Sequence, residues 1–130
     1  MSRPHRVAVA PADGIGPEIV DSATRIATEA LEQVGAASAI DWFEIAVGRG
    51  ALEASGDALP PESVAALRDS SGLVLGPVDH ATYPRRPGGP RQNPSGELRK
   101  HFDLFANVRP ARTMPGIPAV GAGVDLVVVR

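Results

Sequence analysis

Three arginines stand where they could meet one polyanionic ligand. Arg99 falls in a predicted helix, Arg109 at the end of a predicted strand and Arg130 at the end of a later strand. A guanidinium group is planar and always charged, and its charge-assisted hydrogen bonds to carboxylate or phosphate contribute about 1.5–3 kcal/mol each. The alternative is three unrelated surface arginines.

The charge around these arginines favours an anionic ligand. The segment from Tyr83 to Arg112 carries seven cations and two acids, a local charge of +5 in a chain of net charge −2. An arginine-rich coding bias would produce the same composition. A nucleic-acid-binding module is the weakest alternative, because Phe102 and Phe105 have the character of core positions rather than of stacking platforms.

A glycine-containing turn offers a second candidate site. Residues 13–18 read Asp-Gly-Ile-Gly-Pro-Glu between a predicted strand and a predicted helix. Glycines there let the backbone approach a ligand, and the helix N-terminus offers free amides. The dinucleotide fingerprint G-x-G-x-x-G requires glycine at position 19, which is isoleucine, so the Rossmann motif is absent. The alternative is a bare strand–turn–helix corner.

Other chemistry is excluded or unsupported by the sequence. The chain has no cysteine, which removes thiol catalysis, zinc–thiolate sites and disulfides. Its three histidines lack metal-ligand spacing, and no Ser/His/Asp or paired-carboxylate arrangement stands out. No stretch approaches the roughly 18 apolar residues of a membrane span, and the first apolar run is too short for a signal peptide. We therefore expect a cytoplasmic protein without a membrane or nucleic-acid partner.

The elements that position these residues alternate along the chain. Strand, helix, strand, helix and strand follow one another, which is typical of a parallel sheet covered by helices. The region 48–57 is ambiguous between a short helix and a loop, and the loop 79–94 is of the kind that carries function or is disordered. The predicted strands are 6–10, 38–47, 73–75, 105–109 and 125–130, and the predicted helices are 17–34, 59–68 and 95–102.

The first helix has apolar residues at steps of three and four, which predicts one continuous buried stripe. Its members are Ile19, Ala23, Ile26, Ala27, Ala30, Leu31 and Val34.

The final segment, 125–130, predicts a buried parallel strand, which needs neighbours and a crossover after it. We therefore expect the sequence to be cut short. The alternative is that this strand pairs centrally with the first three and is simply the last.

Taken together, four ordered segments resemble the isocitrate/isopropylmalate dehydrogenase family. Residues 13–18 match its opening Gly-Asp-Gly-Ile-Gly-Pro-Glu, with Ala12 in place of the first glycine. Residues 98–111 match Leu-Arg-Lys…Asp-Leu-Tyr-Ala-Asn-Leu-Arg-Pro almost residue for residue, and 73–78 and 125–130 resemble two further family strands. The resemblance spans the whole chain.

The resemblance implies a fold and a reaction. The fold would be the α/β, parallel-sheet, three-layer fold of isopropylmalate dehydrogenase, here only its N-terminal part. Residues 1–110 would belong to the first α/β domain, and 111–130 would begin the second, dimer-forming domain. The reaction would be NAD- or NADP-dependent oxidation of a 2-hydroxy acid followed by decarboxylation, with Mg²⁺ or Mn²⁺ polarising the new carbonyl.

The resemblance also implies roles for particular residues. Arg99, Arg109 and Arg130 would grip the malate carboxylates of a 2-hydroxy di- or tricarboxylate, and Ile15 and Gln92 would form part of the nicotinamide corner. The catalytic Tyr and Lys and the metal-binding aspartates would lie beyond residue 130, so this chain would hold no complete active site and no turnover is expected from it alone. The family dimer completes each site from the partner chain. The alternative is a non-catalytic truncated relative that binds a carboxylate anion or pairs with a full-length subunit.

Two polar residues precede the first arginine where the family sets substrate choice. These are Asn93 and Ser95, and a serine buried against an isopropyl group would lack a partner. We expect a malate with a polar or small substituent rather than isopropylmalate.

Overall fold

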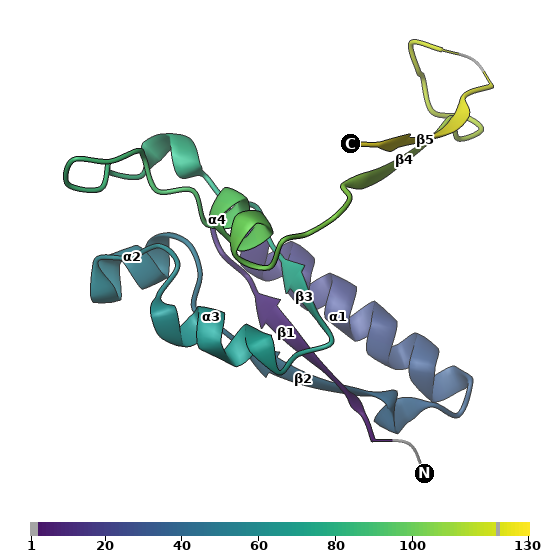
Figure 1. Cartoon of the computed structure of the whole chain (residues 1–130). Coiled ribbons are helices and arrows are strands. Elements are labelled where there is room, and N and C mark those ends of the chain that lie inside the picture. Colours follow the sequence, from purple (N-terminus) through teal and green to yellow (C-terminus); the bar gives the residue numbers. More distant parts are fainter. Residues whose placement is uncertain (1–2, 122) are drawn as a thin grey trace. The chain divides into compact units, whose positions relative to one another are not determined.

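The computed structural model describes residues 3–121 and 123–130, in two compact units, Met1–Leu98 and Arg99–Arg130. The first unit contains a three-stranded parallel sheet of order β2-β1-β3 (Figure 1). Its strands are β1 (His5–Ala10), β2 (Ile40–Glu44) and β3 (Gly72–Leu75). The predicted α/β class with a parallel sheet is confirmed.

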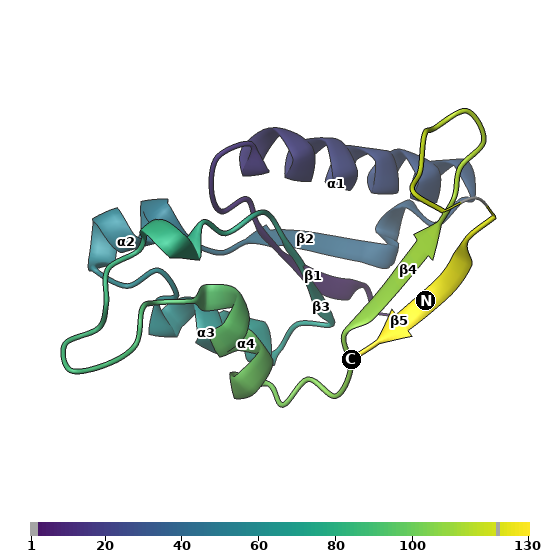
Figure 2. The same ribbon diagram turned by 90° about the horizontal axis from the view of Figure 1, so that it is seen from above.

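Helices cover both faces of this sheet. Helix α1 (Gly16–Gln33) lies on one face and α3 (Pro61–Arg68) on the other (Figure 2). Strand β1 is central, and its Ala8 and Ala10 are fully buried. Because Ala8 and Ala10 are two residues apart on the strand, they face the same side of the sheet, and their small side chains let the layer on that side approach closely.

The predicted buried stripe of α1 is wrong in part. Its sheet-facing side is formed by Val20, Thr24, Ala27, Thr28 and Leu31, which are buried or half-buried. The threonine hydroxyls are tolerated there because each donates to a carbonyl four residues earlier, at 3.0 Å and 2.8 Å. Five residues of the predicted stripe are exposed instead, namely Ile19, Ala23, Ile26, Ala30 and Val34.

The second strand is shorter than predicted, and the ambiguous region is helical. A short 3-10 turn, Ala37–Ala39, precedes β2, so the strand begins at Ile40. Helix α2 (Arg49–Ser55) fills the region 48–57. Glycines bound it on both sides: Gly48 has φ 95° and Gly56 has φ 79°, which favour glycine.

The second unit contains an antiparallel ribbon, which corrects the prediction for the final strand. Strand β4 (Val108–Arg112) pairs with β5 (Asp125–Val129), and both strands are exposed along their whole length. The final strand is therefore neither parallel nor central to the first sheet in the described residues. Strand β4 also continues through Pro110, because in a two-stranded ribbon each strand has an unpaired edge where proline is accepted.

The predicted domain boundary at residue 110 falls inside β4, whereas the two compact units meet between Leu98 and Arg99. The division of the chain into domains at residue 110 stays a prediction.

The carbonyl of Pro11 fixes how the end of β1 meets its neighbours. It lies between two glycines: a Cβ on Gly16 would lie 1.9 Å from the Pro11 oxygen, and one on Gly76 would lie 2.0 Å from it. The backbone of Gly76 also donates to Ala10 O at 2.8 Å, which extends the β1–β3 pairing. Both glycines are therefore required by backbone packing, independently of any ligand.

We predict that Gly76→Ala lowers the free energy of unfolding by about 3 kcal/mol, because the new methyl group would overlap a backbone atom that cannot rotate away. The matched control is Gly72→Ala on the same strand, where a Cβ meets nothing within 4 Å. This control should change stability by no more than about 1 kcal/mol. Urea unfolding followed by Trp42 fluorescence measures both, and equal losses for the two variants would contradict the packing argument.

Candidate functional site

Three arginines surround one hollow in the second unit. Arg99, Arg109 and Arg130 line a space of about 560 Å³. The structure thus brings together the three cations that the sequence singled out, although they are separated along the chain. The other lining residues are Leu104, Ala106, Asn107 and Val108. We call this space the arginine hollow.

The β4–β5 ribbon holds two of these arginines at one end. Asn107 N donates to Arg130 O at 2.8 Å, and Arg130 N donates to Asn107 O at 3.1 Å. This reciprocal pair continues the ladder one step beyond Val108 and Val129. Arg109 follows on β4, and Arg99 comes from helix α4 (Pro94–His101).

The arginine hollow is suited to an anion with more than one charge. Among the described residues that line it there are three cationic side chains and no acidic side chain. These side chains give a positive local potential, which attracts anions. Binding of a substrate by these arginines stays a prediction.

Asn93 caps the helix that carries Arg99. Its Oδ1 accepts the N–H of Gly96 at 3.1 Å, while Glu97 Oε1 accepts the N–H of Asn93 at 3.0 Å. This arrangement resembles a capping box, but the returning carboxylate comes from the fourth helical residue rather than the third. Ser95, in the first turn of the same helix, is half-buried. Both residues belong to the first unit, and their predicted contribution to substrate selection stays a prediction.

Gln92 has a structural role that the sequence did not reveal. Its side chain is 5% exposed; Oε1 accepts the N–H of Ala58 at 2.8 Å, and Nε2 donates to Gly56 O at 3.3 Å. The amide thus ties the segment before α4 to the segment after α2. Ile15, by contrast, is 63% exposed at the turn before α1, where a flat ligand could lie against it. The predicted cofactor roles of Gln92 and Ile15 stay predictions.

Asp13, in the glycine turn, has a structural role that the sequence alone did not predict. It is 7% exposed, and its carboxylate accepts hydrogen bonds from Arg49 N at 2.7 Å, from Asp79 N at 2.8 Å and from the Tyr83 hydroxyl. Its own N–H donates to Pro77 O at 2.9 Å. One buried carboxylate therefore joins the turn after β1, the start of α2 and the loop after β3.

The environment of Asp13 favours its charged form. Burial alone would raise its pKa, but hydrogen bonds from Tyr83, Arg49 and Asp79, with the nearby Arg49 charge, outweigh burial and hold the pKa below 3.8. Burial and the same hydrogen bond raise the pKa of Tyr83. Gly48 is required beside this carboxylate, because a Cβ there would lie 2.6 Å from Asp13 Oδ1.

Ala12 occupies a strained position in the same turn. Its φ is 60°, in the left-handed region that costs an L-residue roughly 1–2 kcal/mol. This gives a physical reason for the glycine that the family motif has at this position.

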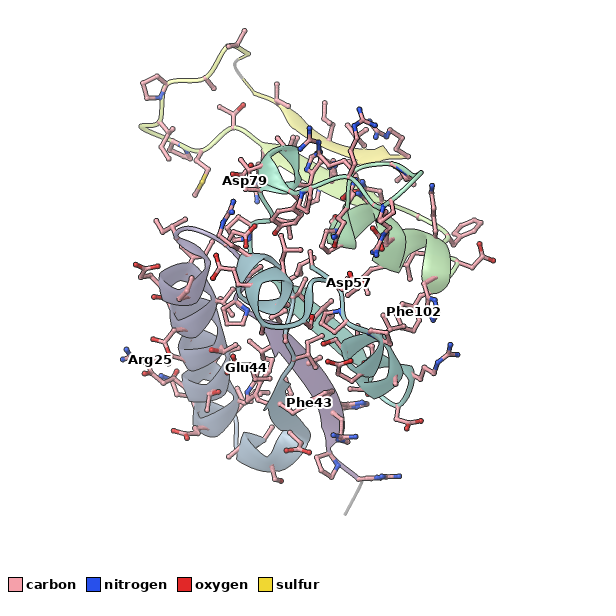
Figure 3. All side chains as sticks on the ribbon, turned by 90° about the vertical axis from the view of Figure 1, so that its left-hand side faces the viewer. Arg25, Phe43, Glu44, Asp57, Asp79 and Phe102 are labelled. Atoms are coloured by element: carbon pink, nitrogen blue, oxygen red, sulfur yellow. The ribbon has the colours of Figure 1, made fainter. Side chains whose placement is uncertain are left out.

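The loop 79–94, predicted to carry function or to be disordered, is folded on itself. Arg86 donates to both oxygens of Asp57 at 3.0 Å and 3.1 Å and to Glu97 Oε2 at 2.9 Å. Figure 3 shows Asp57 in the segment between α2 and α3. The Arg86 hydrogen bond, against burial, lowers the pKa of Asp57. Arg85 and Arg91 form an antiparallel bridge across the loop.

The part of the chain that the structure describes contains no group of three or more His, Cys, Asp or Glu side chains able to hold a metal ion. These residues alone therefore do not fit the Mg²⁺ or Mn²⁺ that the resemblance implies. Within the same described part, no helix is both long and apolar enough to cross a membrane.

Comparison with known proteins identifies the family. Residues 6–130 match the isocitrate/isopropylmalate dehydrogenase family, so the chain belongs to it. The resemblance stated from the sequence motifs is confirmed.

Curated relatives and solved structures agree with this assignment. The chain is 34% identical to 3-isopropylmalate dehydrogenase of Saccharolobus solfataricus over 125 residues, which are 96% of this chain and 34% of that protein. Isocitrate dehydrogenase of Methylococcus capsulatus matches with a TM-score of 0.76 and 31% identity, covering 96% of this chain and 34% of that one. A β-decarboxylating dehydrogenase of Thermococcus kodakarensis matches with a TM-score of 0.64 and 32% identity, covering 97% and 33%. The chain therefore spans about a third of the length of the relatives it matches.

The Asp13 carboxylate predicts a specific pH dependence. Because its pKa in the folded state lies below the usual value of 3.8, its contribution to stability is present above that pH and is lost as the pH falls through the folded-state pKa. Asp13→Asn should lower the free energy of unfolding at pH 7 by about 2–4 kcal/mol, since a buried acceptor is replaced by a donor. The deficit should shrink below pH 3.8.

Chemical unfolding at several pH values measures this. Asp69→Asn makes the same change at an exposed carboxylate and should shift stability by no more than about 0.5 kcal/mol at any pH. A deficit for Asp13→Asn that is the same at pH 3 and pH 7 would show that the charge is not what stabilises the turn.

Proposed function

We propose that this chain supplies the carboxylate-binding arginines of an NAD(P)-dependent oxidative decarboxylase acting on a 2-hydroxy, malate-type acid such as isocitrate or 3-isopropylmalate. The observation that carries the proposal is the arginine hollow, which is lined by Arg99, Arg109 and Arg130 and has no acidic side chain among its described lining residues. Membership of the isocitrate/isopropylmalate dehydrogenase family supports the type of reaction.

The hollow's chemistry fits the first requirement of this reaction, which is to hold a polyanion in one orientation. Two carboxylates of a malate unit carry two charges, and three guanidinium groups can bind both through paired hydrogen bonds. Fixing both ends of the malate unit leaves its hydroxyl carbon at a defined position, as hydride transfer requires. The 2-hydroxy acid would lose a hydride to NAD(P)⁺ and the hydroxyl proton to a base, and the resulting keto acid would then release CO₂.

The glycine turn is the place on this chain that best suits the nicotinamide end of the cofactor. Ile15 offers an exposed apolar side chain, and the Asp13 network holds the turn that carries it. The side-chain amide of Gln92 already serves Ala58 and Gly56, so in this conformation it contributes by holding the loop. When bound, the cofactor supplies the hydride acceptor. Mg²⁺ or Mn²⁺ would require ligands outside the residues described here.

The choice of substrate is set by groups beyond the malate unit. Asn93 and Ser95 are both polar and half-buried at the start of α4. Their character favours a malate with a polar or small substituent over one with an isopropyl group.

We propose that the whole protein is a cytoplasmic homodimer in which the partner subunit completes each site.

The alternative is a non-catalytic relative that binds a carboxylate anion or pairs with a full-length subunit. It keeps the arginine hollow and differs in lacking turnover. The intact mass of the gene product purified from its own cells separates the two at the outset, because a species of 13.5 kDa would favour the alternative.

We predict that Arg109→Ala lowers kcat/KM of the native gene product by about 100-fold or more, because a charge-assisted contact to the substrate is lost. Reduction of NAD⁺ or NADP⁺ with Mn²⁺ present, on isocitrate, 3-isopropylmalate, tartrate and malate, measures this and identifies the preferred acid. A clear preference for 3-isopropylmalate would overturn the proposed role of Asn93 and Ser95.

Arg112→Ala is the matched control. Arg112 lies on the same strand, does not line the hollow and pairs with Asp125 at 3.7 Å. Its loss should change kcat/KM by no more than about twofold, because exposed ion pairs contribute little. If Arg109→Ala and Arg112→Ala behave alike, the arginine hollow is not the substrate site.

A further inference from the structure

We propose that Asn107 is a positioning residue that orients the guanidinium of Arg109 toward the ligand without neutralising its charge. This inference rests on the proposed function of the arginine hollow. Asn107 itself lines the hollow, and its Oδ1 accepts a hydrogen bond from Arg109 Nε at 3.2 Å.

The choice of donor atom determines how Arg109 can meet a carboxylate. A guanidinium binds a carboxylate either through Nε and one terminal nitrogen or through its two terminal nitrogens. Asn107 engages Nε, so the remaining fork is the end-on pair Nη1 and Nη2. The side chain thereby selects one of two binding geometries.

The neutrality of Asn107 is as important as its oxygen. Among the described lining residues of the hollow, none has an acidic side chain. An aspartate at position 107 would accept from the same Nε but would pair with Arg109 and cancel its charge. An amide accepts the hydrogen bond and leaves the full positive charge for the ligand.

The backbone of Asn107 does a separate job that substitution leaves intact. Its N–H and C=O pair with Arg130 at 2.8 Å and 3.1 Å, at the end of the β4–β5 ribbon. Replacing only the side chain therefore tests orientation of Arg109 without releasing Arg130. Since Asn107 is half-buried, the substitutions do not disturb a packed core.

The test compares Asn107→Ala and Asn107→Asp in the native gene product. The dissociation constant for malate, measured by calorimetry, and KM and kcat with the preferred acid are the readouts. We expect Asn107→Ala to weaken malate binding and raise KM by about 10-fold, and Asn107→Asp to do so by about 100-fold, with smaller effects on kcat. A merely structural need for an acceptor would give the opposite order, with aspartate close to the native residue and alanine worst.

Two controls separate the possible failures. Ala111→Asp adds the same charge at an exposed β4 position that does not line the hollow, and it should raise KM by no more than about threefold. Arg109→Ala reports on the proposed function itself. If Arg109→Ala abolishes binding but both Asn107 variants bind as the native protein does, the inference about Asn107 is wrong and the proposed function stands. If Arg109→Ala binds malate normally, the proposed function fails and this inference fails with it.

Discussion

The first unit depends on one buried carboxylate, that of Asp13. A charged group at 7% exposure is costly unless each lone pair has a donor, and here the donors come from two other segments, the start of α2 and the loop after β3. Since all of them must be in place for the carboxylate to be satisfied, the turn after β1, the start of α2 and the loop after β3 are ordered together. The glycines around this point serve that packing: Gly48 makes room for the carboxylate, and Gly16 and Gly76 make room for the Pro11 carbonyl. The turn that resembles a ligand-binding loop therefore has a structural role, which is to connect these three segments.

The charged groups of the second unit have an environment opposite to that of Asp13. Asp13 is surrounded by donors that satisfy it, whereas the arginines of the hollow face a space that holds no lining acid among the described residues. Exposure of these arginines costs little free energy, because exposed guanidinium groups are hydrated when no anion is bound. The ribbon supplies geometry rather than burial: its reciprocal Asn107–Arg130 backbone pair sets the spacing of the cations at its end. The buried carboxylate therefore belongs to the first unit, and the three arginines of the hollow belong to the second.

The sequence predicted the parallel sheet and the alternation of strands and helices along the chain. It also singled out the three arginines that line one hollow in the structure. Alternation of strands and helices carries that information locally, and the arginine-containing motif is specific to the family. The direction of the last strand could not be predicted in this way, because β5 is apolar enough for a buried parallel strand and only its pairing with β4 shows otherwise. The inward face of α1 was missed because Thr24 and Thr28 look polar until their hydroxyls are seen bonded to the helix backbone. Asp13 and Gln92 were undervalued because their partners lie far away in the sequence, at Tyr83 and Ala58.

The topology of the first sheet has a consequence for how the chain folds. Central strand β1 is made before both of its partners, which lie far from it along the chain, with Val7 opposite both Trp42 and Gly72. The ribbon of the second unit is more local, with Arg112 opposite Asp125. Loop closure over short separations is fast, and parallel pairing over long ones is slow. During synthesis β1 must therefore remain unpaired until β2 and then β3 have left the ribosome, which makes it the segment most in need of protection from other chains.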